Sequence, residues 1–370
     1  MIPALKHIDQ ATAGWLTERL QMHGCLKRGA VASVEQRAVS VSGVAHHAHL
    51  HLTYTADAAH TVDATHSVDA NEPHCPTQLF LKINKAEFQW AHKEAEFYSK
   101  LVPMMEAAQP QRRWPFARCF DAAYNPQNSA SHLLLEDLSE THAAATPPLP
   151  PTDEHCQQVM EALAAFHAFW WEHPRLGKGV AEPRTLDSIR ELQRAGGINF
   201  AAWSDYVGDR VTTERKALIE RIITQWPRRR TARLARGQGV TLVHRDTHTA
   251  NFLFPKAFED AVRITDWQSW RIDCATDDLA LFMAAQWYPE RRARLERPLL
   301  ERYLAQLGQD GVTGYTWDDL WYDYRASILR LFSIFIGGWH PRRVPSLWWD
   351  RTERCLMAVA DLGCMELLDA

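Results

Sequence analysis

The chain has 370 residues, of which 46% are hydrophobic and 23% charged, and its formal net charge is -4. This balance is typical of a globular protein and excludes wholesale disorder. A slightly acidic chain also lacks the signature of a nucleic-acid-binding protein, and its length is sufficient for two domains or one two-lobed unit.

The N-terminal part of the chain predicts a β-hairpin and then a long insertion. The segments ASVEQRAVSV (residues 32–41) and AHLHLTYT (48–55) alternate as paired strands do, with SGVAHH (42–47) between them. Residues 57–76 are rich in Ala, His, Asp and Thr and have no apolar periodicity, so we expect a flexible surface insertion there.

Three further elements complete a β-rich N-terminal lobe. In chain order they are a strand, a helix and a buried strand: QLFLKI (78–83), EFQWAHKEAEFYSKLVPMM (87–105) and SHLLLED (131–137).

The chain from Leu138 onward predicts mainly helices. ATPPLPPT (145–152) is a stiff connector, and Asp153 is placed to cap a helix with one apolar stripe, formed by Val159, Leu163, Phe166 and Trp170. GVTLVHRD (239–246) and the stretch from Asn251 to Trp267 predict a hairpin-like pair among the helices. We therefore predict an α+β, two-lobed fold. A small antiparallel β-sheet lobe (1–137) precedes a larger, mainly helical lobe (138–370).

The cysteines and the lack of recognisable targeting signals indicate the cellular compartment that we expect for this protein. The seven cysteines are scattered and form no CxxC pair, which is typical of free thiols in a reducing compartment. The N-terminus lacks the pattern of a secretory signal, and the most apolar stretch, ILRLFSIFIGGW, is shorter than the roughly 20 residues that cross a bilayer. We expect a cytoplasmic protein without a membrane partner.

The stretch LVHRDTHTANFLF (242–254) places polar residues between two apolar runs. His244, Arg245, Asp246 and Asn251 match the H-R-D-x-x-x-x-N pattern of a phosphoryl-transfer catalytic loop. A hydroxyl is a poor nucleophile, so a carboxylate must orient it and accept its proton, and Asp246 is the candidate base. Hard cations such as Mg²⁺ prefer oxygen ligands, which Asn251 and Asp266 both supply.

The N-terminal lobe carries candidate nucleotide-binding residues. Lys82 lies in a predicted strand, where its ammonium can hold the α- and β-phosphates of ATP. Glu94 on the next helix can pair with Lys82, and Glu96 is a competing candidate. At the lobe border, backbone groups of Glu136 and Leu138 can hydrogen-bond an adenine edge.

In this order, the motifs resemble those of the aminoglycoside phosphotransferase and choline kinase superfamily, which has a protein-kinase-like fold. The resemblance is nearest to the ecdysteroid-kinase-like (CHK-type) branch and covers roughly residues 31–281. The segments that carry it are FLKI, EAEFY, LLLEDL, EALAAFHAFWW, VHRDTHTANFLF, ITDWQSW and DDLALF.

The resemblance implies roles for the motif residues. Asp246 looks like the catalytic base, Asn251 and Asp266 like the magnesium ligands, and Lys82 and Glu94 like the phosphate-positioning pair. It also implies that His244 is a structural residue of the loop, that His248 orients the loop, and that Asp278 is a structural carboxylate of the helical lobe.

The sequence differs from protein kinases at positions that affect the expected class of substrate and the binding of the nucleotide. Gln268 stands where protein kinases carry Gly, and no Ala-Pro-Glu or activation segment follows, so a protein substrate is disfavoured. The phosphate-covering loop has one glycine, so Ser42 and Gly43 would have to cradle the phosphates through a hydroxyl and backbone N–H groups. A G-x-x-x-x-G-K-[ST] loop is absent.

The histidines of the hairpin and insertion offer a zinc interpretation. They are His46, His47, His49, His51, His60, His66 and His74, with Cys75 beyond. Structural zinc sites take ligand pairs from two turns, whereas these residues lie on one strand or in the insertion. Exposed polar positions are therefore the favoured interpretation.

The fifteen tryptophans bear on the acceptor. The tryptophans near the C-terminus are expected either to pack the core of the C-terminal lobe or to bind a flat alcohol or a quaternary ammonium group. The segment GGWHPRRVPSLWW (337–349) is expected to form an irregular part of the acceptor-binding site. The late helices mix acidic residues with arginines, which favours a less charged, more hydrophobic acceptor over a polycationic aminoglycoside. The late tryptophans are Trp317, Trp321, Trp339, Trp348 and Trp349.

Two functional interpretations follow from these residues. The first is an ATP- and Mg²⁺-dependent kinase that transfers the γ-phosphoryl group to a hydroxyl of a small molecule. The alternative is a catalytically weak or inactive nucleotide-binding pseudokinase scaffold. The acceptor, the choice between ATP and GTP, and the oligomeric state stay open.

Overall fold

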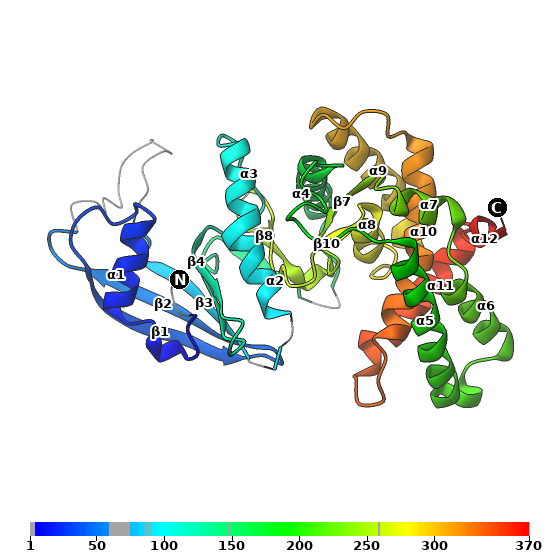
Figure 1. Ribbon diagram of the computed structural model, residues 1–370, viewed down its shortest axis with the longest axis horizontal. Coiled ribbons are helices and arrows are strands. Elements are labelled where there is room, and N and C mark those ends of the chain that lie inside the picture. The colour runs from blue at the N-terminus through cyan, green and yellow to red at the C-terminus, as the bar shows by residue number, and fades with distance from the viewer. Residues whose placement is uncertain are drawn as a thin grey trace. The chain divides into compact units, whose positions relative to one another are not determined.

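The computed structural model describes residues 4–58, 75–85, 87–88, 90–146, 149–257 and 260–369. The chain divides into two compact units (Figure 1). The first unit comprises Met1–Ala143, Pro255–Glu259 and Arg263–Ser269, and the second comprises Ala144–Phe254, Asp260–Val262 and Trp270–Ala370. Most of the insertion expected at 57–76, including His60, His66 and His74, lies outside the described residues.

The first unit is built on a five-stranded antiparallel sheet with the order β1-β2-β3-β5-β4. This sheet and the mainly helical second unit confirm the predicted α+β fold class. The strands are β1 (Val31–Val41), β2 (Ala45–Tyr54), β3 (Gln78–Asn84), β4 (Cys119–Tyr124) and β5 (Ser131–Glu136).

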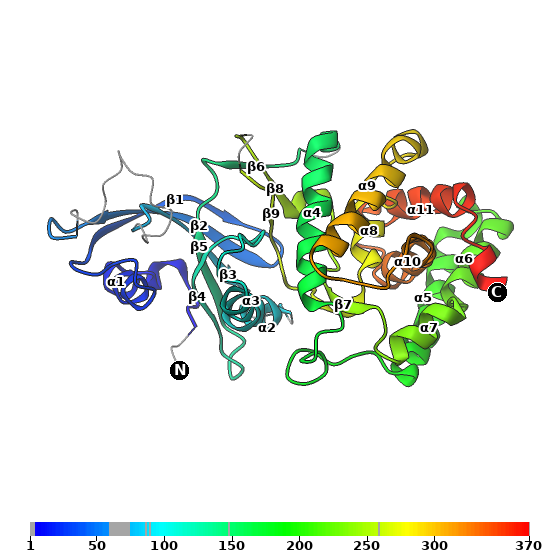
Figure 2. The same ribbon diagram turned by 90° about the horizontal axis from the view of Figure 1, so that it is seen from above.

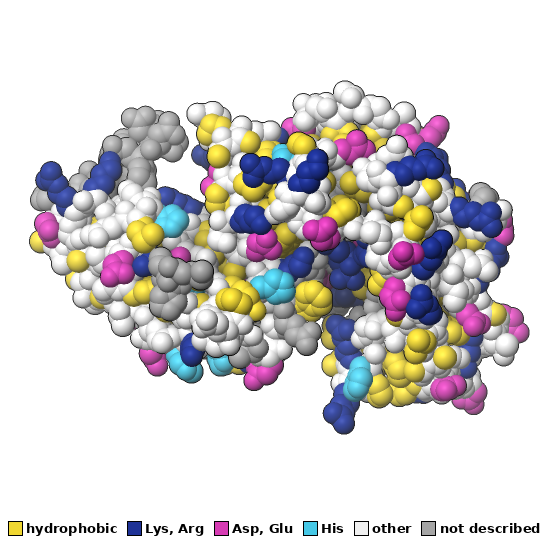
Figure 3. Space-filling model, viewed as in Figure 1, with side chains coloured by type: hydrophobic (Ala, Val, Ile, Leu, Met, Phe, Trp, Pro, Cys, Tyr) yellow, Lys and Arg dark blue, Asp and Glu magenta, His cyan; other side chains and the backbone are white. Residues whose placement is uncertain are grey.

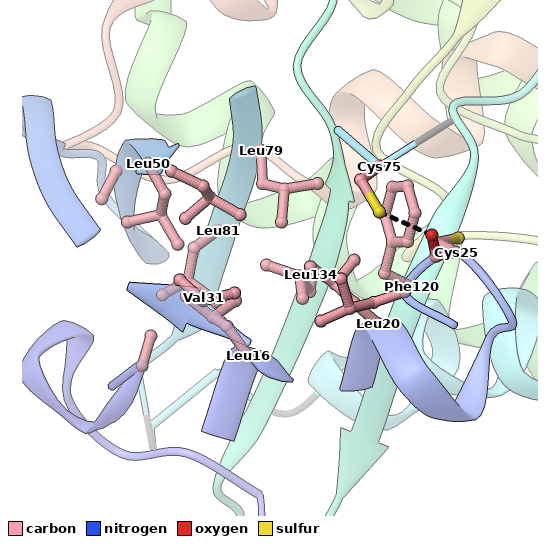
Figure 4. Close-up of a cluster of buried hydrophobic side chains, with 14 of the residues drawn as sticks. Leu16, Leu20, Cys25, Val31, Leu50, Cys75, Leu79, Leu81, Phe120 and Leu134 are labelled. Carbon is pink, nitrogen blue, oxygen red and sulfur yellow. Dashed lines mark hydrogen bonds between the residues drawn. The ribbon is translucent and has the colours of Figure 1, made fainter. Parts of the chain in front are cut away.

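One face of this sheet carries the core of the first unit. Alternate residues of β3, namely Leu79, Leu81 and Ile83, point into it because successive side chains of a strand lie on opposite faces. Leu16 and Leu20 of α1 (Ala13–Met22) pack against this face (Figure 4). A 3₁₀ turn, η1 (Ile8–Gln10), precedes α1.

The β1–β2 hairpin is tighter than the sequence indicates. The connection is residues 42–44, so His46 and His47, expected in the loop, belong to β2. Ser42 closes the turn, because its backbone N–H donates to the Ala45 carbonyl (2.8 Å) and its hydroxyl accepts from the Ala45 N–H (3.0 Å). A polar residue that satisfies turn backbone groups lets both strands continue further than alternation alone predicts.

The predicted helix at 87–105 is observed as one helical run displaced toward the C-terminus. It consists of a helix, a wider π-helical segment and a second helix: α2 (Ala91–Glu96), η3 (Phe97–Leu101) and α3 (Val102–Ala108). Single π-helical turns often mark positions where a helix adjusts to functional or packing constraints.

The second unit is mainly helical, and α10 contacts α5, α6, α8, α9 and α11 within it (Figure 2). None of the described helices is long and apolar enough to cross a membrane. The helices are α4 (Asp153–Trp170), α5 (Leu186–Val207), α6 (Thr213–Thr224), α7 (Arg228–Ala235), α8 (Thr276–Phe282), α9 (Pro289–Gln309), α10 (Trp317–Gly337), α11 (Trp349–Asp361) and α12 (Glu366–Asp369), with the short segments η4 (Gly208–Arg210), η5 (Thr249–Asn251) and η6 (Pro345–Leu347).

The start of α4 corrects the predicted cap. The cap is Thr152, whose hydroxyl accepts from the backbone N–H of His155, and Asp153 is the first helical residue. Asp153 instead pairs with Arg294 of α9. Its carboxylate in the first helical turn also interacts favourably with the helix dipole. The predicted apolar stripe of α4 is confirmed, because all four of its residues are fully buried.

The short strands of this region correct another prediction. β7 (Val240–Val243) pairs antiparallel with β10 (Arg271–Cys274) and not with the strand that follows the loop. β10 is buried and lies opposite β7 with Arg271 across from Val243, a long-range pairing that local alternation does not reveal. The remaining short strands are β6 (His142–Ala144), β8 (Phe252–Pro255) and β9 (Arg263–Ile264).

Surface charge and cysteine chemistry are unremarkable. Acidic, basic and hydrophobic side chains are interspersed over the face shown in Figure 3, in keeping with the small net charge. None of the seven cysteines, all of which lie among the described residues, forms a disulfide.

Candidate functional site

Lys82 is buried between two carboxylates in the first unit. Its Nζ lies 2.8 Å from Oε2 of Glu94 in α2 and 2.6 Å from Oδ1 of Asp266. Strand alternation explains this position, because Lys82 points away from the core face that Leu81 occupies. Burial opposes the charge, but Glu94 and Asp266 outweigh it and hold the pKa of Lys82 above its ordinary value. Lys82 is therefore a fixed cation at neutral pH.

The two candidate glutamates of α2 have different environments. Glu94 is buried and pairs with Lys82, whereas Glu96 accepts a hydrogen bond from Lys100 one helical turn later (3.0 Å). Helix periodicity accounts for the difference, since residues two apart do not share a face.

The turn that carries Asp266 is held by a tryptophan. Asp266 has a left-handed backbone (φ 65°), and its Oδ2 accepts from Nε2 of Gln268 (3.0 Å). Trp267 stacks on Phe97 of η3, with 4.0 Å between ring centroids, and its Nε1 donates to the Ile264 carbonyl (2.9 Å). The stacked indole stabilises a turn conformation that an L-residue otherwise disfavours. The sequence shows Trp267 but does not indicate this role.

The other candidate nucleotide-binding groups make local hydrogen bonds. Lys85 donates to the carbonyls of Ser42 (2.8 Å) and Gly43 (3.3 Å) at the β1–β2 turn. The backbone N–H of Glu136 donates to the Arg118 carbonyl (2.9 Å), and the Leu138 carbonyl accepts from the His142 N–H (2.8 Å). The predicted contacts of these residues with a nucleotide stay a prediction.

Asp278 organises the loop of residues 244–251 in the second unit. Its fully buried carboxylate accepts from the backbone N–H groups of His244 and Arg245, both at 2.7 Å, and from Nε2 of His167 at 3.1 Å. The His167 ring also hydrogen-bonds the hydroxyl of Tyr303 through Nδ1 (2.9 Å). Side chains from α4, α8 and α9 thus fix the start of the loop.

Asp246 lies on this loop with its side chain partly exposed and its backbone held. Its N–H donates to Nδ1 of His244 (3.1 Å), and its carbonyl accepts from Nδ2 of Asn251 (2.7 Å). His248 Nε2 lies 3.7 Å from its Oδ1. The backbone of Arg245 is left-handed (φ 70°), which turns the loop sharply just before Asp246. The carboxylate is therefore presented by a rigid backbone.

An arginine that sequence reasoning did not single out also lies near Asp246. Arg351 of α11 is close enough to Asp246 for their charges to interact. Burial lowers the pKa of Arg351, Asp246 opposes that shift, and Arg343 adds to it. The residue is distant in sequence, so no local motif points to it.

The candidate metal ligands have suitable donor chemistry. The Asp266 carboxylate belongs to the first unit and the Asn251 amide to the second, and both are hard oxygen donors of the kind Mg²⁺ prefers. Among the described residues, no group of three or more His, Cys, Asp or Glu side chains is arranged to hold a metal ion. The described hairpin histidines of the zinc interpretation lie along β2.

The coupling between Lys82 and Glu94 can be measured. We expect Lys82→Met and Glu94→Gln to be less destabilising together than the sum of the single changes, by about 2 kcal/mol. Lys82→Met leaves the buried Glu94 carboxylate without its cation, Glu94→Gln leaves Lys82 with Asp266 alone, and the double change removes both charges of the pair. Urea unfolding of the four proteins gives the coupling energy. The exposed pair Glu96–Lys100 is the matched control, with an expected coupling of about 0.5 kcal/mol or less. Equal couplings for both pairs would contradict the assignment.

Comparison with known proteins gives one family and several similar folds. The model of the ecdysteroid kinase-like family matches residues 82–311. Comparison with curated proteins finds no match.

Solved kinase structures share the fold over nearly the whole chain. A choline kinase from Cryptosporidium parvum has a TM-score of 0.52 at 12% identity and covers 91% of this chain and 92% of its own. A microcompartment-associated aminopropanol kinase has a TM-score of 0.51 at 14% identity, with coverages of 96% and 98%. A candidate aminoglycoside phosphotransferase from Ralstonia eutropha has a TM-score of 0.51 at 14% identity, with coverages of 95% and 98%. At these identities the likeness establishes the protein-kinase-like fold.

Proposed function

This chain belongs to the ecdysteroid kinase-like family, and we propose that it transfers the γ-phosphoryl group of ATP to a hydroxyl of a small molecule. The observation that carries the proposal is the loop of residues 244–251. Its partly exposed Asp246 is presented by a backbone that Asp278, His244 and Asn251 hold in place. A fixed, accessible carboxylate is what orientation and deprotonation of an alcohol require.

We assign the remaining roles on the same basis. Asp246 orients the acceptor hydroxyl and accepts its proton, while Lys82, fixed by Glu94, positions phosphate oxygens. Asn251 and Asp266 would hold Mg²⁺, which, when bound, neutralises charge on the phosphate oxygens. Backbone groups at the lobe border and the hairpin turn would contact the nucleotide: Glu136, Leu138, Ser42 and Gly43.

The test is an ATP-consumption screen over hydroxylated metabolites and antibiotics. We expect at least one acceptor to gain a phosphoryl group for each ATP consumed. Chelation of Mg²⁺ with EDTA should lower that rate by about a hundredfold or more, because the metal supplies several kcal/mol of charge stabilisation. Addition of excess Mg²⁺ should restore the rate, which controls for damage by the chelator. Transfer that persists without divalent metal would contradict the assigned ligands.

A second candidate is a nucleotide-binding scaffold with little or no activity. The β1–β2 turn favours it, because the Ser42 hydroxyl is engaged within the turn and Lys85 occupies the carbonyls of Ser42 and Gly43. Calorimetric binding of ATP, without hydrolysis or transfer to any acceptor in the screen, would support the scaffold and exclude the kinase.

A further inference from the structure

Five arginines gather around two buried aspartates in the second unit. The aspartates are Asp273 of β10 and Asp277 of α8, and both are almost inaccessible to solvent. The five arginines are Arg184 before α5, Arg230 of α7, Arg245 of the catalytic-loop motif, Arg271 of β10 and Arg330 of α10.

Four of these arginines form ion pairs with the two aspartates. Oδ2 of Asp273 accepts from Nε of Arg184 and Nη2 of Arg330, both at 3.0 Å, and Nη2 of Arg271 lies 3.2 Å away. Oδ1 of Asp277 accepts from Nη2 of Arg230 (2.7 Å). Five guanidinium groups against two carboxylates leave an excess of three positive charges in this cluster.

Several donors of the cluster are buried without an acceptor among the described residues. They are Nη2 of Arg184, Nε of Arg245 and Nε of Arg271. Burial, with repulsion from Arg330, lowers the pKa of Arg245 to about 10, so this residue stays charged at neutral pH. Burial and Arg330 likewise lower the pKa of Arg271. Buried guanidinium N–H groups that lack an acceptor are unfavourable unless an anion accepts their hydrogen bonds.

The excess charge lies beside the proposed catalytic base. β10 pairs with β7 so that Arg271 is opposite Val243, and β7 continues directly into Arg245 and Asp246. Arg351 interacts with Asp246 from α11, and its own neighbours include Arg343 and Arg354. A ligand that presents its hydroxyl to Asp246 would therefore meet guanidinium groups.

We propose that the acceptor alcohol carries an oxyanion, a carboxylate, sulfate or phosphate ester, which Arg271, Arg245 and Arg184 bind while its hydroxyl faces Asp246. This inference rests on the proposed phosphotransferase function. Guanidinium groups bind such oxyanions through paired, charge-assisted hydrogen bonds. It replaces the expectation of a weakly charged acceptor that the composition of the late helices favours, and it disfavours a polycationic aminoglycoside.

The kinetic test uses acceptors matched in shape and different in charge. Each test acceptor is supplied in three forms: a hydroxy acid, the corresponding neutral amide and the corresponding amine. Sulfate and phosphate monoesters of a diol are tested as further anionic acceptors. We expect transfer to the anionic members. Arg271→Gln should raise KM for the preferred anion about tenfold or more while KM for ATP changes less than about twofold. Arg271→Lys should recover part of the loss.

Arg271→Gln is a suitable variant because Arg184 and Arg330 still satisfy Asp273. Arg302→Gln is the control, since that exposed arginine of α9 pairs with Glu161 away from the cluster, and its kinetics should match the parent protein. Preference for neutral or cationic members, or an unchanged anion KM in Arg271→Gln, would overturn the inference. A rise in KM for ATP instead would assign the arginines to nucleotide phosphates.

Anion binding can be measured without turnover. Sodium sulfate, compared with sodium chloride of equal ionic strength, should raise the melting temperature of the parent protein more than that of Arg271→Gln, because general stabilisation by excluded sulfate acts equally on both proteins. No sulfate-specific shift would refute the anion site. Sulfate stabilisation without transfer to any acceptor would refute the phosphotransferase and leave the anion site. Transfer to neutral acceptors, with no effect of Arg271→Gln, would refute the anionic acceptor and leave the phosphotransferase.

Discussion

Asp246→Asn is expected to lower turnover by about a hundredfold to ten-thousandfold and to leave nucleotide affinity nearly unchanged. The amide has the shape of the carboxylate but cannot accept the hydroxyl proton. The loop itself should persist, because the hydrogen bonds that hold Asp246 use its backbone N–H and carbonyl. Steady-state rates with the best acceptor of the screen and calorimetric ATP binding measure the two effects separately.

A matched control separates catalysis from a general loss of charge. Asp187→Asn changes an exposed aspartate at the start of α5 that pairs only with Arg190 among the described residues, and it should leave the rate within about twofold. An Asp246→Asn enzyme with the turnover of the parent protein would remove Asp246 as the base. Loss of ATP binding and turnover together would indicate that Asp246 shapes the nucleotide site instead.

The parts of the site that were predictable are those encoded by short-range sequence. The loop motif spans residues 244–251, and Lys82 lies in the strand that the sequence predicts, with Leu81 and Ile83 on the opposite, core face. The apolar stripe of α4 likewise follows from helical periodicity and is buried as predicted. Such features can be predicted because each depends on residues within a single helix, strand or loop.

The unpredicted features depend on contacts between distant residues. Asp278 is 34 residues from His244 and 111 from His167, and Arg184 is 89 from Asp273. No periodicity relates such positions, so neither the buried carboxylate that holds the loop nor the arginine cluster follows from the motif. The wrong strand pairing has the same origin. The partner of β7 is β10, which follows the loop motif and two further short strands in the sequence.

The wrong helix cap has a different cause. Thr152 and Asp153 are adjacent, and both residue types are common caps, so composition alone does not choose between them. In the structure Thr152 is the cap, and Asp153 in the first helical turn pairs with Arg294 of α9. Local propensity was therefore correct to within one residue.

Asp278→Ala is expected to lower the free energy of unfolding by about 4 kcal/mol or more and to reduce turnover strongly. The change removes the acceptor of three hydrogen bonds and leaves two backbone N–H groups and Nε2 of His167 unsatisfied in a fully buried place. Asp278→Asn should be intermediate, because one amide oxygen replaces two carboxylate oxygens and the amide nitrogen faces a donor. Urea unfolding and steady-state kinetics measure both effects.

The comparison of stability with activity identifies how Asp278 acts. Asp209→Ala, at an exposed position of η4, is the control and should cost less than about 0.5 kcal/mol. If Asp278 only positions the loop, the folded Asp278→Asn protein should lose kcat more than ATP affinity, because Lys82 and Glu94 belong to the other unit and keep their pairing. If Asp278→Ala lowers the free energy of unfolding by less than about 1 kcal/mol, other contacts hold the loop, and the positioning role of Asp278 would be refuted.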